Sequence, residues 1–124
     1  MTVDAILEYG KKLVLIKRKY PPCEGMWALP GGIVKMDETL EQAIKREVKE
    51  ETGVDCKIKK LLGAFSAIDR DPRGRSISIC YHCTTEQEPE KSSEEAKEIR
   101  LFSPSSMPEL AFDHEKMIKL IHED

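Results

Sequence analysis

The sequence predicts an α/β fold, a sandwich in which a mixed β-sheet lies between helices. Several short segments alternate apolar and polar residues, as half-buried strands do. Two segments with helical spacing accompany them, one in the middle of the chain and one near its end. We find no internal repeat and no linker in the 124 residues, so we expect one domain over residues 1–124.

The strands are expected in two groups, one on each side of the central helix. The first group contains residues 3–9 and 12–18, joined by a turn at Gly10 and Lys11, and a short extended segment at 27–29. The second group comprises residues 56–68, which form either one long strand or two strands broken near Gly63, and residues 76–84 and 98–102. A turn at 69–75 and an acidic loop at 86–97 separate them.

Capping residues define both helices. Thr39 and Gln42 form a capping box and Gly53 supplies a left-handed stop, so residues 40–52 should be helical. Asp113 is a suitable N-cap for the last helix, which we expect to continue almost to the end of the chain.

One face of the central helix carries carboxylates where a helix packed on a core should be apolar. An apolar stripe begins this face, and at about 100° per residue it continues into Glu47, Glu50 and Glu51. Carboxylates at this spacing repel one another and are costly to desolvate without a cation. Oxygen ligands suit Mg²⁺ or Mn²⁺, with coordination left for water and substrate phosphate. We therefore interpret the helix as a metal-binding platform.

The sequence around this helix resembles the Nudix hydrolase signature, G-x5-E-x7-R-E-U-x-E-E-x-G-U, where U is a bulky aliphatic residue. Residues 32–54 match it at every defined position, and the preceding segment GMWALPG resembles the usual Nudix lead-in. A looser resemblance extends over nearly the whole chain. It implies the same α/β/α sandwich and the hydrolysis of a nucleoside diphosphate linked to another group, with water attacking the pyrophosphate bridge.

The resemblance also implies roles for individual residues. Glu50 and Glu51 are the expected metal ligands, and the carbonyl of Gly31 is a further ligand typical of the family. Glu47 is either a third ligand or the base that orients the attacking water. Arg46 lies one turn before Glu50 and is expected to fix the rotamer of that carboxylate.

Substrate contacts are expected from a basic turn. Arg70, Arg73 and Arg75 form a cluster suited to a phosphate dianion, although residues 71–74 also have the chemistry of a simple type I turn. The stretch DPRGRSIS resembles a segment of the ADP-ribose pyrophosphatases within the Nudix superfamily. Arg18, at the end of the second strand, either reaches a phosphate or is a solvated strand end.

Two further kinds of side chain outside the signature are candidates. An additional acidic group often completes sites of this family, and Glu94, Glu95 and Glu98 could supply it; a solvated acidic loop is the alternative interpretation. Phe65 and Tyr81 are aromatic residues that could stack on adenine, although such residues more often belong to a core.

The resulting hypothesis is a Mg²⁺-dependent enzyme, with Mn²⁺ as the alternative metal, that converts ADP-ribose into AMP and ribose 5-phosphate. A housecleaning nucleoside triphosphate pyrophosphatase, which would release pyrophosphate, is the first alternative. A non-catalytic ADP-ribose sensor is the more remote one. The resemblance to ADP-ribose enzymes also implies a homodimer.

Composition limits the partners and the compartment. The net charge of −3 argues against nonspecific binding of nucleic acid or membranes as the main task. No apolar stretch approaches a membrane span and the first residues do not resemble a signal peptide, so we expect a cytoplasmic location. Cys80 and Cys83 should point to opposite faces of a strand, which favours reduced thiols over a zinc or disulfide site.

Overall fold

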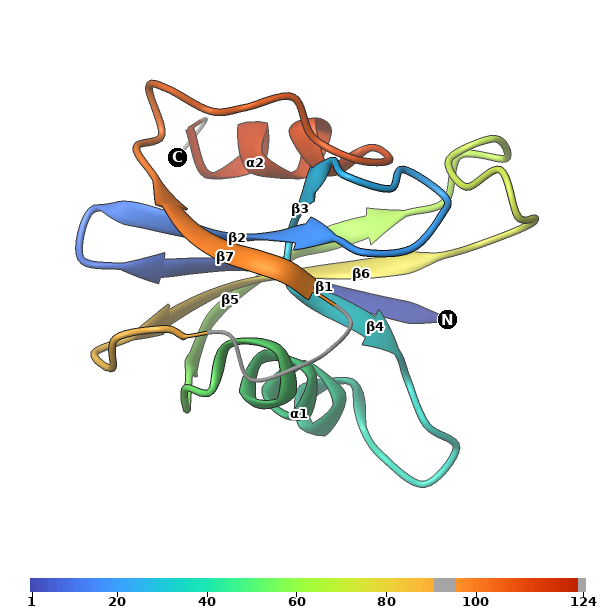
Figure 1. Ribbon diagram of the computed structural model, residues 1–124. Coiled ribbons are helices and arrows are strands. Elements are labelled where there is room, and N and C mark those ends of the chain that lie inside the picture. Colours follow the sequence, from blue (N-terminus) through green and yellow to red (C-terminus); the bar gives the residue numbers. More distant parts are fainter. Residues whose placement is uncertain (91–95, 123–124) are drawn as a thin grey trace.

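The computed structural model describes residues 1–90 and 96–122, in which a β-sheet lies between two helices (Figure 1). In chain order the elements are β1 (Thr2–Tyr9), β2 (Lys12–Arg18), β3 (Trp27–Ala28), β4 (Gly31–Ile33), α1 (Leu40–Thr52), β5 (Lys57–Phe65), β6 (Ser78–Thr85), β7 (Ala96–Phe102) and α2 (His114–His122). The main path of the sheet has the order β3-β2-β1-β6-β5, while β4 pairs with β1 and β7 pairs with β2. The predicted α/β sandwich with a mixed sheet is therefore confirmed.

Strand β1 organises the sheet. It pairs in parallel with β6 along its whole length. Its other edge is divided, because residues 8–9 pair with β2 and residues 2–4 pair with β4, both antiparallel. This division places Gly31 of β4 directly beside Asp4 of β1. The beginning of the chain thus lies against the segment that leads into α1.

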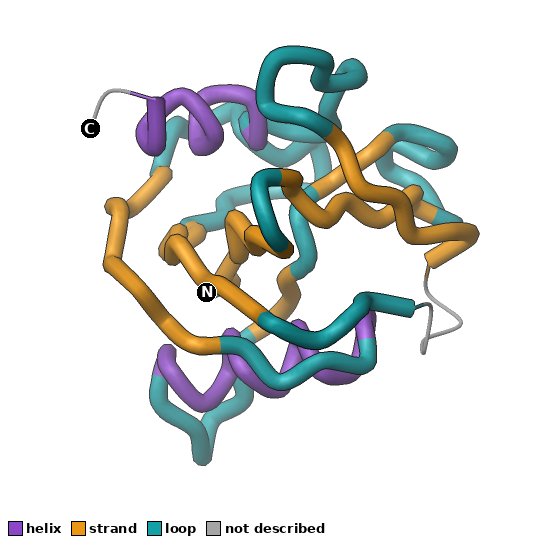
Figure 2. Tube along the Cα trace, turned by 90° about the vertical axis from the view of Figure 1, so that its left-hand side faces the viewer, coloured by secondary structure: helices purple, strands orange, loops and turns teal. Residues whose placement is uncertain are grey.

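The two helices lie on opposite sides of the strands (Figure 2), and the two main apolar clusters lie one beneath each helix. Alternate residues of β1 point to opposite faces, as the period of a strand requires. The first core contains Val3, Ala5, Leu7, Ala43, Ile44 and Val48, and the second contains Ile6, Leu13, Leu15, Met117 and Ile118. Cys83 belongs to the first core and Cys80 to the second, so the two thiols point to opposite faces as predicted. All four cysteines are free.

Helix α1 has the predicted limits because both of its caps form. The hydroxyl of Thr39 accepts from the Gln42 amide at 3.1 Å, and the Thr39 amide donates to the Gln42 side chain at 2.8 Å. Gly53 ends the helix in the left-handed region with φ of 75°, and its N–H donates to the carbonyl of Lys49.

The predicted strands form in the expected order with small changes at their ends, and the structure adds β4, which the sequence did not predict. Strand β7 begins at Ala96, before the predicted start at residue 98, and β5 ends at Phe65 rather than continuing to residue 68. Pairing between β5 and β6 shifts register near Gly63. No helix within the described residues is long and apolar enough to cross a membrane.

Candidate active site

A cavity of about 840 Å³ lies where α1, β1, β4, the loop 69–76 and the start of α2 meet. Two buried glutamates of α1 line it, together with arginines from α1, from the end of β2 and from the loop 69–76. Its ionisable and aromatic lining residues are Asp4, Arg18, Lys19, Tyr20, Lys35, Arg46, Glu47, Glu51, Arg70, Asp71, Arg73, Arg75, Phe112 and His114. Residues from both ends of the chain therefore contribute to one site.

The three glutamates of the helix differ in their surroundings. Glu47 and Glu51 are only 8% and 4% exposed and both line the cavity. The side chain of Glu50 is 54% exposed and lies at the edge of the stripe. The expectation that all three lie on one buried face therefore holds for Glu47 and Glu51 but not for Glu50. The packed face of the helix is centred on its buried apolar residues Ala43, Ile44 and Val48, and Glu50 lies outside that face.

Arg46 links the start of α1 to these glutamates. Its Nε and Nη2 donate to the two carboxylate oxygens of Glu38 at 2.9 and 2.6 Å, and its Nη1 contacts Glu47 at 2.7 Å and Glu50 at 3.2 Å. Nη2 also donates to the Ile33 carbonyl at 3.0 Å. The hydrogen bonds from Arg46 lower the pKa of Glu38 to about 2. The predicted contact with Glu50 is present, and Arg46 holds Glu47 as well.

Two consecutive glycines allow the backbone to approach the buried carboxylates. The Gly31 N–H donates to Oε2 of Glu51 at 3.1 Å. A Cβ on Gly31 would lie 2.2 Å from the carbonyl oxygen of Val3, and a Cβ on Gly32 would lie 2.5 Å from the carboxyl carbon of Glu47. Both distances are far inside normal contact, so a side chain would force backbone to move at Gly31 and the carboxylate end of Glu47 to move at Gly32.

This set of groups fits a hard divalent cation. Glu47 and Glu51 supply carboxylate oxygens one turn apart, and Gly31 and Gly32 bring the backbone into contact with them. Within residues 1–90 and 96–122, no three His, Cys, Asp or Glu side chains are already arranged as a metal site. Instead Glu47 accepts from Arg46 and Glu51 accepts from Gly31, contacts that offset the mutual repulsion of the carboxylates.

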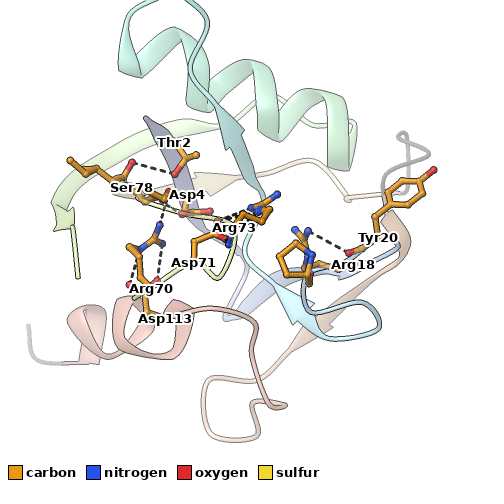
Figure 3. Close-up of polar contacts among 12 residues, drawn as sticks. Thr2, Asp4, Arg18, Tyr20, Arg70, Asp71, Arg73, Ser78 and Asp113 are labelled. Carbon is orange, nitrogen blue, oxygen red and sulfur yellow. Dashed lines mark hydrogen bonds and ion pairs between the residues drawn. The ribbon is translucent and has the colours of Figure 1, made fainter. Parts of the chain in front are cut away.

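A buried polar network borders the glycines on the side of α2. Asp4 accepts a hydrogen bond from the Ser78 hydroxyl, and its Oδ1 lies 3.5 Å from Nε2 of His114 (Figure 3). Nδ1 of His114 accepts from the Leu29 amide at 3.1 Å, so the ring proton is placed on Nε2, facing Asp4. Burial raises the pKa of Asp4, but His114 and Ser78 outweigh it and the pKa lies below its ordinary value. Sequence reasoning missed Asp4, although an aspartate inside an apolar strand is a signal.

Arg70 belongs to a second buried pair rather than to an open phosphate site. Its Nε and Nη2 donate to the two carboxylate oxygens of Asp113 at 2.9 and 2.8 Å, and its Nη1 donates to Ser76 at 3.1 Å. Its side chain is almost fully buried. The prediction that Arg70 binds substrate conflicts with these contacts, because its donors are directed at the protein. Asp113 precedes α2 as predicted, with both carboxylate oxygens directed to Arg70.

The other predicted arginines line the cavity. Arg18 is held by the carbonyls of Pro22 and Tyr20, at 2.7 and 3.4 Å. Its guanidinium lies 5.0 Å from the ring centre of Phe112, and that of Arg73 lies 5.7 Å from the same ring. Phe112 has a left-handed backbone with φ of 52°. An unusual conformation of this kind is a frequent feature of functional loops.

The predicted aromatic platforms lie elsewhere. Tyr81 is buried in the core beneath α1, where its hydroxyl donates to Glu41 at 3.0 Å. Phe65 packs against the core beneath α2. Neither lines the cavity, whereas Phe112 and Tyr20 do. The geometry therefore favours Phe112, which sequence reasoning missed, as the aromatic residue of the cavity, and stacking on Phe65 or Tyr81 stays a prediction.

Of the three candidate acidic groups outside the signature, Glu98 is the one within the described residues. Glu98 pairs with Lys17 at 3.8 Å and with Arg100 at 3.0 Å, and it does not line the cavity. These contacts favour the interpretation of a solvated surface residue. Glu94 and Glu95 lie outside the described residues.

Comparisons with known proteins agree on one family. The NUDIX domain family matches residues 1–121. An ADP-ribose pyrophosphatase of Methanocaldococcus jannaschii is 50% identical over 119 residues, which cover 96% of this chain and 70% of that protein. An ADPR responsive transcriptional repressor of Acinetobacter baylyi is 30% identical over 96% of this chain and 51% of its own length.

Solved structures give the same result. The NUDIX domain of Shewanella oneidensis NrtR, complexed with ADP ribose, has a TM-score of 0.87 and 32% identity, covering 98% of this chain and 85% of that one. A bifunctional NMN adenylyltransferase/ADP ribose pyrophosphatase of Francisella tularensis has a TM-score of 0.85 and 30% identity, covering 99% of this chain and 40% of that one.

Proposed function

Because this chain belongs to the Nudix hydrolase family, we propose that it cleaves ADP-ribose into AMP and ribose 5-phosphate. The observation that carries the proposal is a single cavity of about 840 Å³ in which buried glutamates face arginines and an aromatic ring. This volume lies in the range of nucleotide-sized ligand sites, roughly 300–1,000 Å³. The similarity to an ADP-ribose pyrophosphatase and to an ADP-ribose-bound domain supports this choice of substrate.

Helix α1 would act on the pyrophosphate bridge. Nudix hydrolases use divalent metal ions, and we propose Mg²⁺, held by Glu47, Glu50, Glu51 and the carbonyl of Gly31. The ion would neutralise charge on the phosphoryl oxygens. Water attacks one phosphorus, a new P–O bond forms and the bridging P–O bond breaks, while a carboxylate takes the proton of the water. Glu47 is either a further ligand or this base, and Arg46 holds its carboxylate in place.

Arg18 and Arg75 are the best-placed side chains for the remaining charge of the substrate. Both line the cavity, and Arg18 is bound through backbone carbonyls that leave its charge uncompensated. The ring of Phe112 lines the cavity close to the guanidinium groups of Arg18 and Arg73, and we propose it in place of Phe65 and Tyr81 as the aromatic contact.

A substrate panel tests this function. ADP-ribose, dinucleotides and nucleoside triphosphates are incubated with the purified chain and Mg²⁺, and the products are separated. We expect kcat/KM for ADP-ribose to exceed that for any common dNTP by about tenfold or more, with AMP and ribose 5-phosphate as products. Faster release of pyrophosphate from a dNTP would assign the chain to the housecleaning class. Tight binding of ADP-ribose without turnover would make it a sensor.

The assembly state and the compartment stay predictions. A homodimer is expected only from the resemblance to ADP-ribose enzymes, and equilibrium sedimentation of the purified chain would test it. A cytoplasmic location is likewise an expectation from the sequence.

A further inference from the structure

The arginine side chains of the cavity fall into two groups. Arg46, Arg70 and Arg73 each pair with a carboxylate at 2.6–2.8 Å. In contrast, no ion pair joins Arg18 or Arg75 to a carboxylate in the part of the chain that the structure describes. The positive charge of the cavity is therefore only partly available to an anionic substrate.

The pair between Asp71 and Arg73 differs from the other two. Asp71 lines the cavity with a side chain that is 9% exposed, while the side chain of Arg73 is 61% exposed. Oδ1 of Asp71 accepts from the Arg73 amide at 2.9 Å, which fixes the carboxylate within the turn. The guanidinium of Arg73 approaches the two oxygens at 3.1 Å from Nε and 2.8 Å from Nη2 (Figure 3).

The two partners are thus held with unequal strength. Asp71 is anchored by the backbone, whereas the exposed guanidinium of Arg73 is held mainly by an ion pair of a kind that contributes little in water. Hydrogen bonds from Arg73 also keep the pKa of Asp71 below its usual value, so the carboxylate is ionised at neutral pH. Asp71 is consequently a fixed negative charge on the cavity wall, beside Arg70 and Arg73.

We propose that Asp71 is a specificity-determining residue, whose fixed charge holds Arg73 and selects against substrates that carry more negative charge. The Coulomb energy between Asp71 and a bound substrate scales with the charge of that substrate. ADP-ribose carries about two negative charges on its pyrophosphate, and a nucleoside triphosphate carries about four. The penalty in free energy is therefore about twice as large for the triphosphate. This inference rests on the proposed hydrolysis of nucleotides and adds the group that sets the charge preference.

The test compares wild type and Asp71→Asn with ADP-ribose and dATP at fixed Mg²⁺. Asparagine keeps the oxygen that accepts from the Arg73 amide, so the turn is preserved while the charge is removed. We expect kcat/KM to rise about threefold for ADP-ribose and, because the energies scale with charge, about tenfold for dATP. The selectivity for ADP-ribose should then fall about threefold. An unchanged or increased selectivity overturns the proposal.

Two further variants make the test specific. Asp69→Asn removes a charge from the same loop at a position outside the cavity lining, and it should leave the selectivity unchanged. Arg73→Gln leaves the charge of Asp71 without its partner, and it should increase the selectivity for ADP-ribose. If Asp71→Asn does not fold, Arg73→Gln decides the outcome, and a selectivity that stays constant or falls in this variant overturns the proposal.

The failure of the proposed function would be visible separately. If the wild type does not cleave ADP-ribose, that function is refuted whatever the variants do. The comparison is then made between dADP and dATP, which differ in charge at the same end of the molecule. Asp71→Asn should favour dATP over dADP relative to wild type, and an equal change in both would refute the role of Asp71.

Discussion

Replacing Gly32 by alanine should disable catalysis while leaving the fold nearly intact. The added Cβ would lie 2.5–2.6 Å from the three carboxyl atoms of Glu47, and ordinary contacts begin near 3.4 Å. The three nearest atoms all belong to the end of a side chain that borders a cavity. The carboxylate of Glu47 can therefore move away, by about 1 Å, and the backbone need not shift.

A displacement of this size has a large catalytic effect. Misplacing a catalytic group by about 1 Å costs on the order of 10²-fold in rate, so we expect kcat to fall by about that factor. The melting temperature should change by no more than about 3 °C, because no backbone contact is broken. Hydrolysis is followed by release of AMP, and thermal unfolding is followed by circular dichroism on the same sample.

Gly31→Ala is the matched comparison, because its Cβ meets backbone instead. It would lie 2.2 Å from the carbonyl oxygen of Val3, so β1 and β4 would have to separate. Overpacking of this kind costs about 1–3 kcal/mol, and we expect the melting temperature to fall by roughly 5–10 °C. A Gly32→Ala variant with wild-type turnover, or one that loses as much stability as Gly31→Ala, would refute the reasoning.

Three further predictions concern the charged groups. Glu51→Gln keeps the size of the side chain but removes its charge, so turnover should fall by on the order of 10²-fold or more. Excess chelator should abolish wild-type turnover. Near-normal rates in either assay would exclude a metal-binding role for Glu51. Arg70→Ala leaves Asp113 without its buried partner, so the free energy of unfolding measured by urea denaturation should fall by about 3–5 kcal/mol. A decrease below about 1 kcal/mol would mean that the ion pair contributes little to stability. The pKa of Glu38 is lowered from 4.5 to about 2 by Arg46, so its contribution to stability is complete above pH 4.5 and is lost as the pH falls towards 2. The difference in melting temperature between wild type and Glu38→Gln should therefore disappear over this range, and a constant difference would contradict the linkage.

The local features of this site were predictable from the sequence because local rules determine them. The capping box and the glycine stop fix the limits of α1 within the segment itself. The helical period then places Glu47 and Glu51 on the packed face. The same period could not decide the exposure of Glu50 at the edge of that face, since this depends on what packs against the helix.

The substrate-facing half of the site was harder to predict because it is assembled from distant segments. Alternation along β5 and β6 shows that neighbouring residues point to opposite faces. It does not show where the cavity opens, so it could not reveal that Phe65 and Tyr81 lie outside the cavity lining. Arg70 looked like its neighbours in the sequence, yet its partner Asp113 lies 43 residues away. Long-range partners of this kind leave no periodic signal.

The parallel pairing of β1 with β6 also determines when the site can appear during synthesis. The hydrogen bond between Ser78 and Asp4 joins residues 74 apart, and α1 lies entirely within that interval. A growing chain that already carries the whole helix still lacks the strand that completes the centre of its sheet, and closing so long a loop is slow. His114 and Asp113 are made later still. Residues as late as Asp113 and His114 must therefore leave the ribosome before the glutamates can face a finished cavity.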